Sequence, residues 1–331
     1  MGTWQLAGRP WGWDFPDEKE SLRALYKFVE LGGNFIDTAW VYGRHDEPGD
    51  PKGGTPSEEF IGNFLKESGN ANKVIVATKI PPKNRKWPAW QGIPISEAFP
   101  NKYIEDYVNG SLQNLKLDVI DLMQFHVWQD DFVKEDGWKK TIQKITKAGK
   151  VKFWGISIND YQPSNCLKTL DTGLIQTIQF IFNIFHQKPV HKLFPYAKKN
   201  NIGLIGRVPL DEGGLTGRLN LKTKFDDPMR SVIFRKDRLV EFVKKQNELE
   251  KLLDGEAKSI PELALRFILS FPEVSTVIPG TRKVKYVELN TSVSDGRKLS
   301  KKLLGELKKH TWERNFYPHV DHALKDSGYI E

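Results

Sequence analysis

The stretch GGNFIDTAWVYG, residues 32–43, places a carboxylate inside what otherwise has the pattern of a buried strand. Phe35, Ile36 and Trp40 are apolar and fit a strand that packs on both faces, whereas Asp37 lies among them. Burying a carboxylate without a partner costs several kcal/mol. We therefore expect that the strand ends at Asp37, which then faces the mouth of the sheet, or that a cation from elsewhere in the chain pairs with it.

Helix-like and strand-like segments alternate outward from this stretch along most of the chain. Residues 17–33 have acidic side chains in the first turn and glycines after the last, which is typical of a helix. Seven strand-like segments follow, from residues 34–39 to residues 275–280, and most are continuous apolar runs. Such runs indicate parallel strands that are buried on both faces.

An eighth strand must precede the first helix if this sheet is to close into a barrel. Only residues 2–8, GTWQLAG, are available for it, so we expect a short first strand at the N-terminus. The sequence thus predicts an α/β fold, a single (β/α)8 barrel over residues 1–331 with an extra C-terminal helix and tail from about residue 298. An open doubly wound sheet is the alternative, but no G-x-G-x-x-G motif follows any strand.

Two long insertions interrupt the alternation, and both follow strands. Residues 81–100 come after the third strand of the expected barrel, and residues 211–257 come after the seventh. Barrel enzymes build their sites at the C-terminal ends of the strands. We therefore expect Trp87 and Trp90 of the first insertion, and residues 226–238 of the second, to form the wall of a substrate pocket.

Composition excludes several classes of partner. The net charge of +8 comes largely from lysines that alternate with apolar positions and glutamates at helical spacing, so solvated helix faces explain it better than nucleic-acid binding. No apolar run approaches the roughly 18 residues that span a bilayer, and residues 1–13 lack the pattern of a signal peptide. The single cysteine, Cys166, excludes an internal disulfide, and we expect a cytoplasmic protein.

Three further polar residues stand at strand ends. Tyr42 follows the second strand of the expected barrel, Lys79 ends the third and His126 ends the fourth. These ends meet in a barrel, so Lys79 is the natural partner of Asp37 and lies beside Tyr42. A cation within about 4 Å lowers a phenol pKa from about 10. Singly, each residue also fits a packing tyrosine, a snorkelling lysine or a core histidine, but together they predict a proton donor, Tyr42.

The pattern glycine, asparagine, two apolar residues and D-T-A-x-x-Y-G in residues 33–43, with the strand-end lysine and histidine, resembles the aldo-keto reductase family. The similarity extends from residue 2 to about residue 317. The resemblance implies these roles: Tyr42 as general acid, Lys79 and Asp37 as the pair that tunes its pKa, His126 as the group that orients the carbonyl, and Trp128 as a pocket residue.

The resemblance also implies a cofactor, NADPH or NADP+ in preference to NADH, and no metal. In GISIND, residues 155–160, Ser157 and Asn159 resemble the adjacent pair that binds the nicotinamide carboxamide, although one residue separates them here. Strand alternation places both on the same face. The full implied set is Gly2, Thr3, Trp4, Asp37, Ser157, Asn159, Gln179, Arg207, Pro209, Leu210, Gly214, Leu215, Gly217, Gly280, Arg282 and Asn290.

Several members of this set carry a specific role. Residues 208–217, VPLDEGGLTG, match the loop whose backbone amides receive the pyrophosphate, where glycines permit close approach. Arg282 resembles the family's phosphate-contacting arginine, and Asn290 its adenine-binding amide. The chain departs from the family at Tyr286, where many members have arginine, and at Leu289, where many have a carboxylate.

Arg207 is a further departure, because the family usually has an aromatic residue there that stacks on the nicotinamide. A planar guanidinium can also stack on a ring, and its charge would then disfavour the oxidised, cationic form of the cofactor. The alternative is an arginine paired with a carboxylate of the barrel, such as Asp211 or Glu212.

The leading expectation is an NADPH-dependent enzyme that reduces a small aldehyde or ketone, with hydride passing from nicotinamide C4 while Tyr42 protonates the oxygen. One alternative is a cofactor-binding regulatory subunit that resembles the potassium-channel β subunits. A metal-dependent barrel hydrolase is a third, but it requires clustered His, Asp or Glu ligands that the strand ends do not supply. The aromatic insertions fit sugars, steroids and aromatic aldehydes equally.

Overall fold

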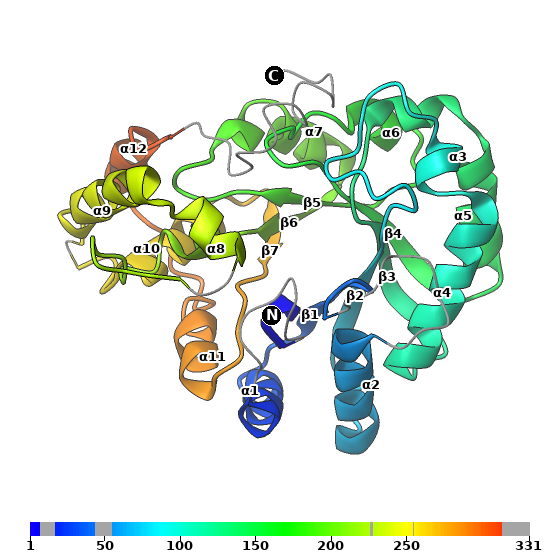
Figure 1. Cartoon of the computed structure of the whole chain (residues 1–331), viewed down its shortest axis with the longest axis horizontal. Helices are drawn as coiled ribbons and strands as arrows, with labels where there is room; N and C mark the ends of the chain where they lie inside the picture. Colours follow the sequence, from blue (N-terminus) through cyan, green and yellow to red (C-terminus); the bar gives the residue numbers. More distant parts are fainter. Residues whose placement is uncertain (7–16, 44–54, 226–227, 254, 313–331) are drawn as a thin grey trace.

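Seven parallel strands form one curled sheet in the computed structural model, which describes residues 1–6, 17–43, 55–225, 228–253 and 255–312. Each strand pairs with the next one along the chain, so the sheet order is the sequence order, and Figure 1 shows the sheet curling around the centre of the molecule. The strands are β1 (Phe35–Asp37), β2 (Ile75–Ile80), β3 (Ile120–Phe125), β4 (Val151–Ser157), β5 (Thr177–Ile181), β6 (Gly203–Arg207) and β7 (Val274–Val277).

The N-terminal residues join the two edges of this sheet. Gly2 forms parallel bridges with both Asp37 in β1 and Gly280 after β7. A Cβ atom on Gly2 would lie 2.9 Å from the carbonyl oxygen of Ile278, so glycine permits this close approach. The chain then enters the 3-10 helix η1 (Trp4–Leu6). The barrel is confirmed, but the first strand expected over residues 2–8 is reduced to one bridge within the described part, and residues 7–8 lie outside it.

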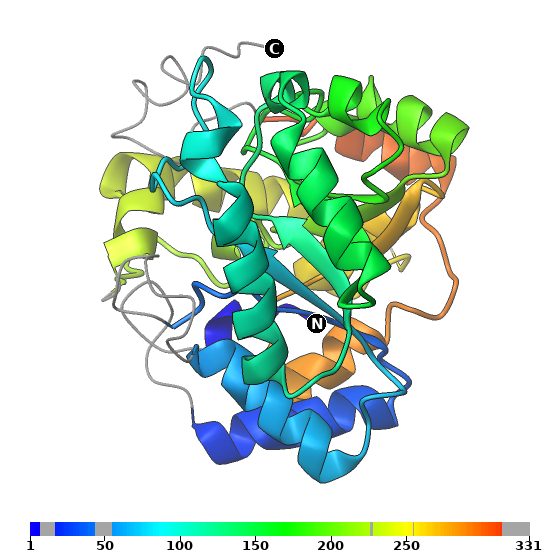
Figure 2. The same cartoon turned by 90° about the vertical axis from the view of Figure 1, so that its right-hand side faces the viewer.

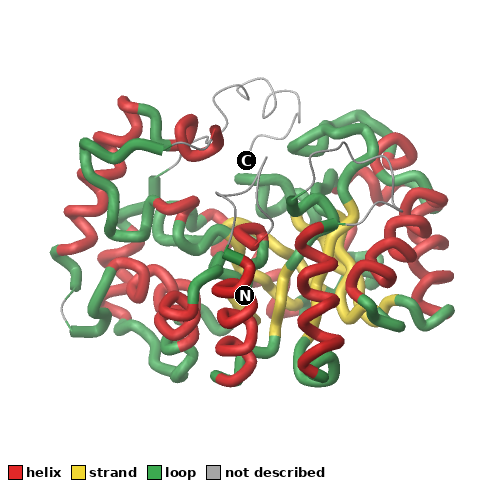
Figure 3. Tube along the Cα trace, turned by 60° about the horizontal axis from the view of Figure 1, so that its bottom comes forward, coloured by secondary structure: helices red, strands yellow, loops and turns green. Residues whose placement is uncertain are grey.

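Helices surround the sheet on its outer side, as Figures 1 and 3 show. Several begin at the capping residues that the sequence provides, since the side chains of Asp17, Thr55 and Ser259 accept hydrogen bonds from the first turns of their helices. The helices are α1 (Glu18–Glu30), α2 (Pro56–Ser68), α3 (Ile95–Ala98), α4 (Asn101–Leu115), α5 (Gly137–Lys147), α6 (Leu167–Leu170), α7 (Leu193–Asn200), α8 (Pro228–Ile233), α9 (Lys236–Glu250), α10 (Ile260–Leu269), α11 (Val284–Thr291) and α12 (Lys301–Lys308).

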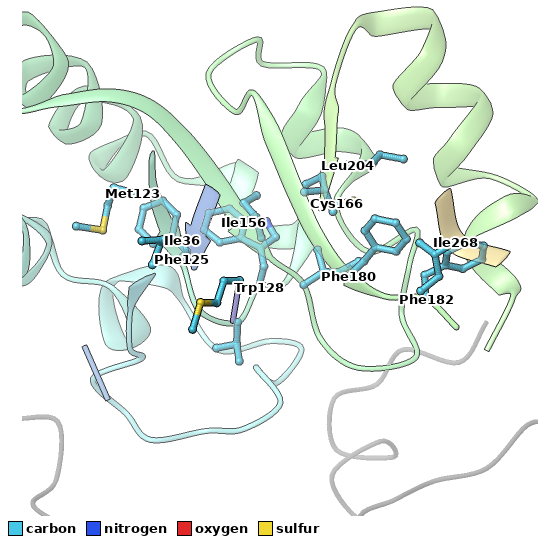
Figure 4. Close-up of a cluster of buried hydrophobic side chains, with 14 of the residues drawn as sticks. Ile36, Met123, Phe125, Trp128, Ile156, Cys166, Phe180, Phe182, Leu204 and Ile268 are labelled. Atoms are coloured by element: carbon cyan, nitrogen blue, oxygen red, sulfur yellow. The ribbon is translucent and has the colours of Figure 1, made fainter. Parts of the chain in front are cut away.

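The hydrophobic core lies between the sheet and these helices. In Figure 2, α4 and α5 run side by side across the outer face of the strands. Figure 4 shows side chains of this core, including Phe125 and Ile156 from neighbouring strands and Phe180 from the next one. None of the helices in the described ranges has the length and apolar character needed to cross a membrane.

Both insertions follow the C-terminal ends of strands, as expected. Residues 81–100 follow β2 and contain α3, whereas residues 211–257 follow β6 and contain α8, α9 and the 3-10 helix η4 (Asp211–Gly213). The extra helix at the C-terminal end is α12, and the tail from residue 313 onward lies outside the described residues. These insertions frame the face of the barrel on which the site is built.

Candidate active site

Asp37 meets its cation at the end of β1. The Nζ atom of Lys79, in β2, lies 2.6 Å from Oδ1 of Asp37 and also donates to the carbonyl oxygen of Thr38 at 2.6 Å. The second carboxylate oxygen, Oδ2, accepts from Nε2 of Gln179 at 2.7 Å. Because neither charged side chain is more than 2% exposed, each ion supplies the compensation that burial of the other requires. The pairing expected from the sequence is therefore present.

Tyr42 and His126 complete a cluster around this pair. The Lys79 ammonium lies 5.2 Å from the centre of the Tyr42 ring, and the ring centres of Tyr42 and His126 are 5.9 Å apart. Trp4 lies on another side of Tyr42, with 6.2 Å between ring centres. The structure thus brings together all four residues expected to be catalytic.

The expected lowering of the Tyr42 pKa is wrong for this cavity. Burial raises the pKa of Tyr42, the charge of Asp37 raises it further, and Arg207 opposes both. Lys79 does not dominate, because its charge is matched by Asp37 at hydrogen-bond distance. Burial, reinforced by the charges of Lys79 and Arg207, holds the pKa of His126 well below its usual range, so the imidazole is neutral.

A cavity of about 760 Å³ extends from this cluster along the C-terminal ends of the strands. Most of the residues expected to bind the cofactor line it: Gly2, Thr3, Trp4, Asp37, Ser157, Asn159, Gln179, Arg207, Pro209, Leu210, Gly280, Arg282 and Asn290. Three do not. Leu215 is buried in the core, Gly217 packs beside Ile260, and a Cβ atom on Gly214 would lie 2.4 Å from the Phe242 ring. These three residues lie on the side of the loop that packs against the core.

The Asn159 side chain is already committed to the protein. Its Oδ1 accepts from the backbone N–H of Ala89 at 2.9 Å, and its Nδ2 donates to the carbonyl oxygen of Ala89 at 2.9 Å and to Gln162 at 3.0 Å. An amide held at both ends is poorly placed to bind a carboxamide as well. The Ser157 side chain makes no such bonds within the part of the chain that the structure describes, so it is the better candidate of the two.

Asn159 belongs to a network of buried amides beneath the insertion of residues 81–100. Gln129 also donates to the carbonyl oxygen of Ala89. The Nδ2 atom of Asn165 donates to Gln129 at 2.8 Å and to Gln162 at 2.9 Å. We call Gln129, Asn159, Gln162 and Asn165 the amide network. It fixes the insertion to the ends of β3 and β4.

The three tryptophans expected in the substrate pocket lie in different environments. Trp87 lines the cavity, and its ring centre is 4.8 Å from that of His126 in an edge-to-face arrangement. Trp90 lies outside the cavity lining, with the Lys86 ammonium 3.6 Å from its ring centre.

The expectation that Trp128 lines the pocket is wrong. Its side chain is fully buried, its indole Nε1 donates to Thr169 at 2.9 Å, and it packs against Phe125 and Trp138 in the core (Figure 4). Aromatic neighbours pack against its ring, and Thr169 accepts a hydrogen bond from its N–H, so the side chain is stable in the core. From residues 226–238, Arg230 and Phe234 line the cavity, whereas residues 226–227 lie outside the described chain.

Arg207 forms an ion pair with Asp160, in place of the expected pairing with Asp211 or Glu212. Its guanidinium contacts the Asp160 carboxylate and donates to the carbonyl oxygen of Ile158 at 3.0 Å. Asp160 was not among the residues expected from the sequence to form the site, although it follows Asn159 at the end of a strand. The same rule that identified Asp37, a charge at the end of an apolar strand, would have found it.

Basic side chains gather in the part of the cavity formed by the loop after β6 and by α11. Arg282 and Lys283 line it, and Arg218 donates to the Tyr286 hydroxyl at 2.6 Å. Tyr286 thus stands where many family members have arginine but holds a cation from the opposite loop. The Asn290 amide donates to Thr281 at 3.0 Å.

No cluster of three or more His, Cys, Asp or Glu side chains suited to a metal occurs among the described residues. The parallel barrel, with a buried lysine–aspartate pair beside a tyrosine and a neutral histidine at the C-terminal ends of its strands, defines a class of barrel oxidoreductases. The aldo/keto reductase family model matches residues 1–311, and the chain belongs to this family.

Individual relatives agree with this assignment. The chain is 30% identical over 298 residues to aldo-keto reductase YhdN of Bacillus subtilis, covering 89% of this chain and 84% of the relative. It is 25% identical over 312 residues to an NADH-specific methylglyoxal reductase of Escherichia coli, covering 89% of this chain and 90% of the relative. The solved structure of a glycerol dehydrogenase from Gluconobacter oxydans superimposes with a TM-score of 0.72 at 28% identity, covering 94% of this chain and 90% of that one.

Proposed function

We propose that this protein is an NADP(H)-dependent oxidoreductase that reduces an aldehyde or ketone to an alcohol, with Tyr42 as the general acid. The observation that carries the proposal is the convergence of Tyr42, Asp37 and His126 in one cavity at the C-terminal ends of the strands, with the buried Lys79 paired to Asp37. A proton donor, a neutral hydrogen-bonding group and a fixed charge pair are what carbonyl reduction requires of the protein.

Each residue has a separate part in this chemistry. The raised pKa of Tyr42 keeps its proton on the phenol throughout the neutral range, so the acid is loaded before a substrate arrives. Neutral His126 offers an N–H to the carbonyl oxygen and thereby orients it toward Tyr42. Lys79 fixes the tyrosine through its position over the ring and stabilises negative charge as the phenol gives up its proton. The nicotinamide, when bound, supplies the hydride.

The cavity suits a dinucleotide cofactor that carries a further phosphate. It is aromatic at the Tyr42 end, where Trp4, Trp87 and His126 line it, and basic where Arg218, Arg282 and Lys283 line it. Phosphate groups favour the basic region, and a guanidinium binds a phosphate with two parallel hydrogen bonds. We assign Arg282 to the 2′-phosphate of NADPH. We also propose that the enzyme is cytoplasmic, since a single cysteine, Cys166, agrees with a reducing compartment.

A cofactor comparison tests this proposal. We expect loss of the absorbance of reduced nicotinamide when the protein is mixed with NADPH and a panel of aldehydes and ketones, and weaker activity with NADH. Arg282→Ala should weaken NADPH binding by about 10-fold to 150-fold, the worth of a charge-assisted hydrogen bond, and leave NADH binding nearly unchanged.

Lys144→Ala, which removes an exposed cation on α5, is the matched control for a general change in charge. Equal losses of affinity for the two cofactors in Arg282→Ala would contradict the assignment of Arg282. Absence of turnover across the panel with both cofactors would contradict the function itself.

A further inference from the structure

Glu212 is a cavity-lining carboxyl that the chemistry above leaves unused. It lies in η4 and lines the same cavity as Tyr42 and Arg207. The neighbouring charged groups have partners, because Asp160 pairs with Arg207 and Asp211 accepts from Nδ2 of Asn183 at 3.3 Å. Within the described ranges, Glu212 itself makes no hydrogen bond or ion pair with another side chain. An acceptor with no partner inside a binding cavity points to a ligand.

The loop that carries Glu212 has an energetically unfavourable backbone conformation. Val208, Asp211 and Glu212 have φ angles of 54°, 55° and 55°, in the left-handed region that residues with side chains rarely adopt. The Nδ2 atom of buried Asn183 donates to the carbonyl oxygen of Val208 at 3.0 Å as well as to Asp211. Such backbone persists only where its surroundings impose it, and it concentrates at functional sites. The loop thus presents Glu212 to the cavity from a fixed position.

The surrounding charges decide what Glu212 can bind. Burial, and then the charges of Asp160 and Asp211, raise the pKa of Glu212 to about 7, while Arg207 lowers it. The carboxyl is therefore ionised in only part of the molecules at neutral pH, and an ammonium ligand would lose its counter-charge in the rest. Hydroxyl groups hydrogen-bond to both forms, and two adjacent hydroxyls match the two oxygens of a carboxylate. The chemistry favours a vicinal diol.

We propose that Glu212 binds a vicinal diol in the cavity beside Tyr42, an inference that rests on the proposed function. Two ligands of an aldo-keto reductase carry this group. One is the ribose next to the nicotinamide, which must lie between Tyr42 and the loop of residues 208–217 if that loop receives the pyrophosphate. The other is a polyhydroxylated carbonyl substrate. Glu212 is in either case a binding residue, and Tyr42 keeps its role as acid.

Binding measurements on the full chain separate these sources. Trp4 and Trp87 line the cavity, so quenching of tryptophan fluorescence reports occupancy without turnover. The variants are Glu212→Ala and Glu212→Gln, with Glu241→Gln on the exposed face of α9 as the matched control. The ligands form two pairs: nicotinamide mononucleotide with 2′,5′-ADP, which lacks the nicotinamide ribose, and erythrose with butanal, which lacks the hydroxyls.

We expect Glu212→Ala to weaken either nicotinamide mononucleotide or erythrose by about 10-fold to 100-fold, while 2′,5′-ADP and butanal stay within about 2-fold. Glu212→Gln should lie between, because an amide offers one acceptor in place of two. A loss confined to the mononucleotide identifies the cofactor ribose, and a loss confined to erythrose identifies the substrate.

Two results would overturn the diol site. One is unchanged binding of both hydroxylated ligands, and the other is an equal loss for all four ligands, which indicates a disturbed loop. Failure of the proposed function is distinguishable from both. A wild-type protein that binds a diol through Glu212 but reduces no carbonyl would keep the site and refute the reductase.

Discussion

Two ion pairs adjoin the same cavity, one through Asp37 alone and the other through both Arg207 and Asp160, and they differ in how completely they are enclosed. In the Lys79–Asp37 pair, 0% and 2% of the side chains are exposed, and further hydrogen bonds occupy both the ammonium and the carboxylate. In the Arg207–Asp160 pair, the corresponding values are 18% and 16%, and the cavity beside it is also lined by Glu212, which has no side-chain partner among the described residues.

The Lys79–Asp37 pair therefore has a fixed charge balance, whereas the charge balance of the Arg207–Asp160 pair can change. The enclosed pair is electrically neutral and cannot rearrange without leaving a buried charge, so burial governs the pKa of Tyr42. The open pair lies in the cavity wall, where a ligand, a pH change or a substitution can alter its balance of charge. Substitutions on each pair therefore test the contrast.

Tyr42→Phe should have the largest effect, because it removes the phenol that donates the proton beside the Lys79–Asp37 pair. We expect carbonyl reduction to fall by about 10²-fold to 10⁴-fold, the usual worth of a general acid, with NADPH affinity within a few-fold of wild type. Steady-state kinetics and cofactor titration measure the two quantities. Turnover within about tenfold of wild type would show that Tyr42 is not the general acid.

Lys79→Met should damage both activity and the fold, since it leaves Asp37 buried and unpaired. Breaking a buried pair typically costs about 3–5 kcal/mol of unfolding free energy, which urea denaturation measures. The double variant Asp37→Asn with Lys79→Met should recover most of that stability without recovering activity. A folded and fully active Lys79→Met protein would show that the pair does not serve Tyr42.

The open pair should instead control which redox form of the cofactor binds better. Asp160→Asn leaves the charge of Arg207 unbalanced and should raise the ratio of the NADP+ to NADPH dissociation constants. Arg207→Tyr leaves Asp160 unbalanced and should lower the ratio. We expect shifts of up to about tenfold, or ~1.4 kcal/mol, in opposite directions.

Fluorescence titration at low and high salt checks these shifts, because an effect inside the cavity should persist when surface fields are screened. Two variants that move the ratio in the same direction would contradict a local charge effect.

Glu212 should give the smallest effect, a loss of stability as pH rises. Its folded pKa of about 7 lies above the ordinary value of 4.5, so the native state binds more protons than the unfolded state between these pH values. Stability is then greatest below this window and declines as pH rises through 7. The decline is on the order of 1 kcal/mol for a partly exposed side chain.

Glu212→Gln should flatten this part of the profile of melting temperature against pH. Burial also raises the pKa of Glu58, but this residue is the same in both proteins, so its contribution cancels in the difference between the two profiles. An identical slope in the variant would show that Glu212 titrates in its ordinary range.

The sequence predicted those features that depend on order along the chain. The alternation of helices and strands, and charges placed at the ends of apolar strands, were sufficient for the barrel and for the pairing of Lys79 with Asp37. The direction in which a side chain points after a strand ends was not predictable. Trp128 follows His126 closely but turns into the core, and Arg207 pairs with Asp160 in the segment that follows β4 and not with a residue of its own loop.

The Tyr42 pKa was missed for a different reason. The sequence identifies a nearby cation but not how deeply the phenol is buried, nor that Asp37 cancels the charge of Lys79. The first strand was overextended because residues 2–8 were the only segment available before the first helix to close the barrel, whereas Trp4 begins a 3-10 helix.

The amide network has a consequence for recombining this barrel with others of its family. Asn159 and Gln129 bond to the backbone of Ala89, and Gln162 and Asn165 hold these two amides in place, so the insertion that carries Trp87 is attached through the whole network. Grafting residues 81–100 alone into another aldo-keto reductase would leave its backbone without these partners. A chimera that exchanges residues 81–100 together with the four amides should instead keep Trp87 in its position in the cavity wall.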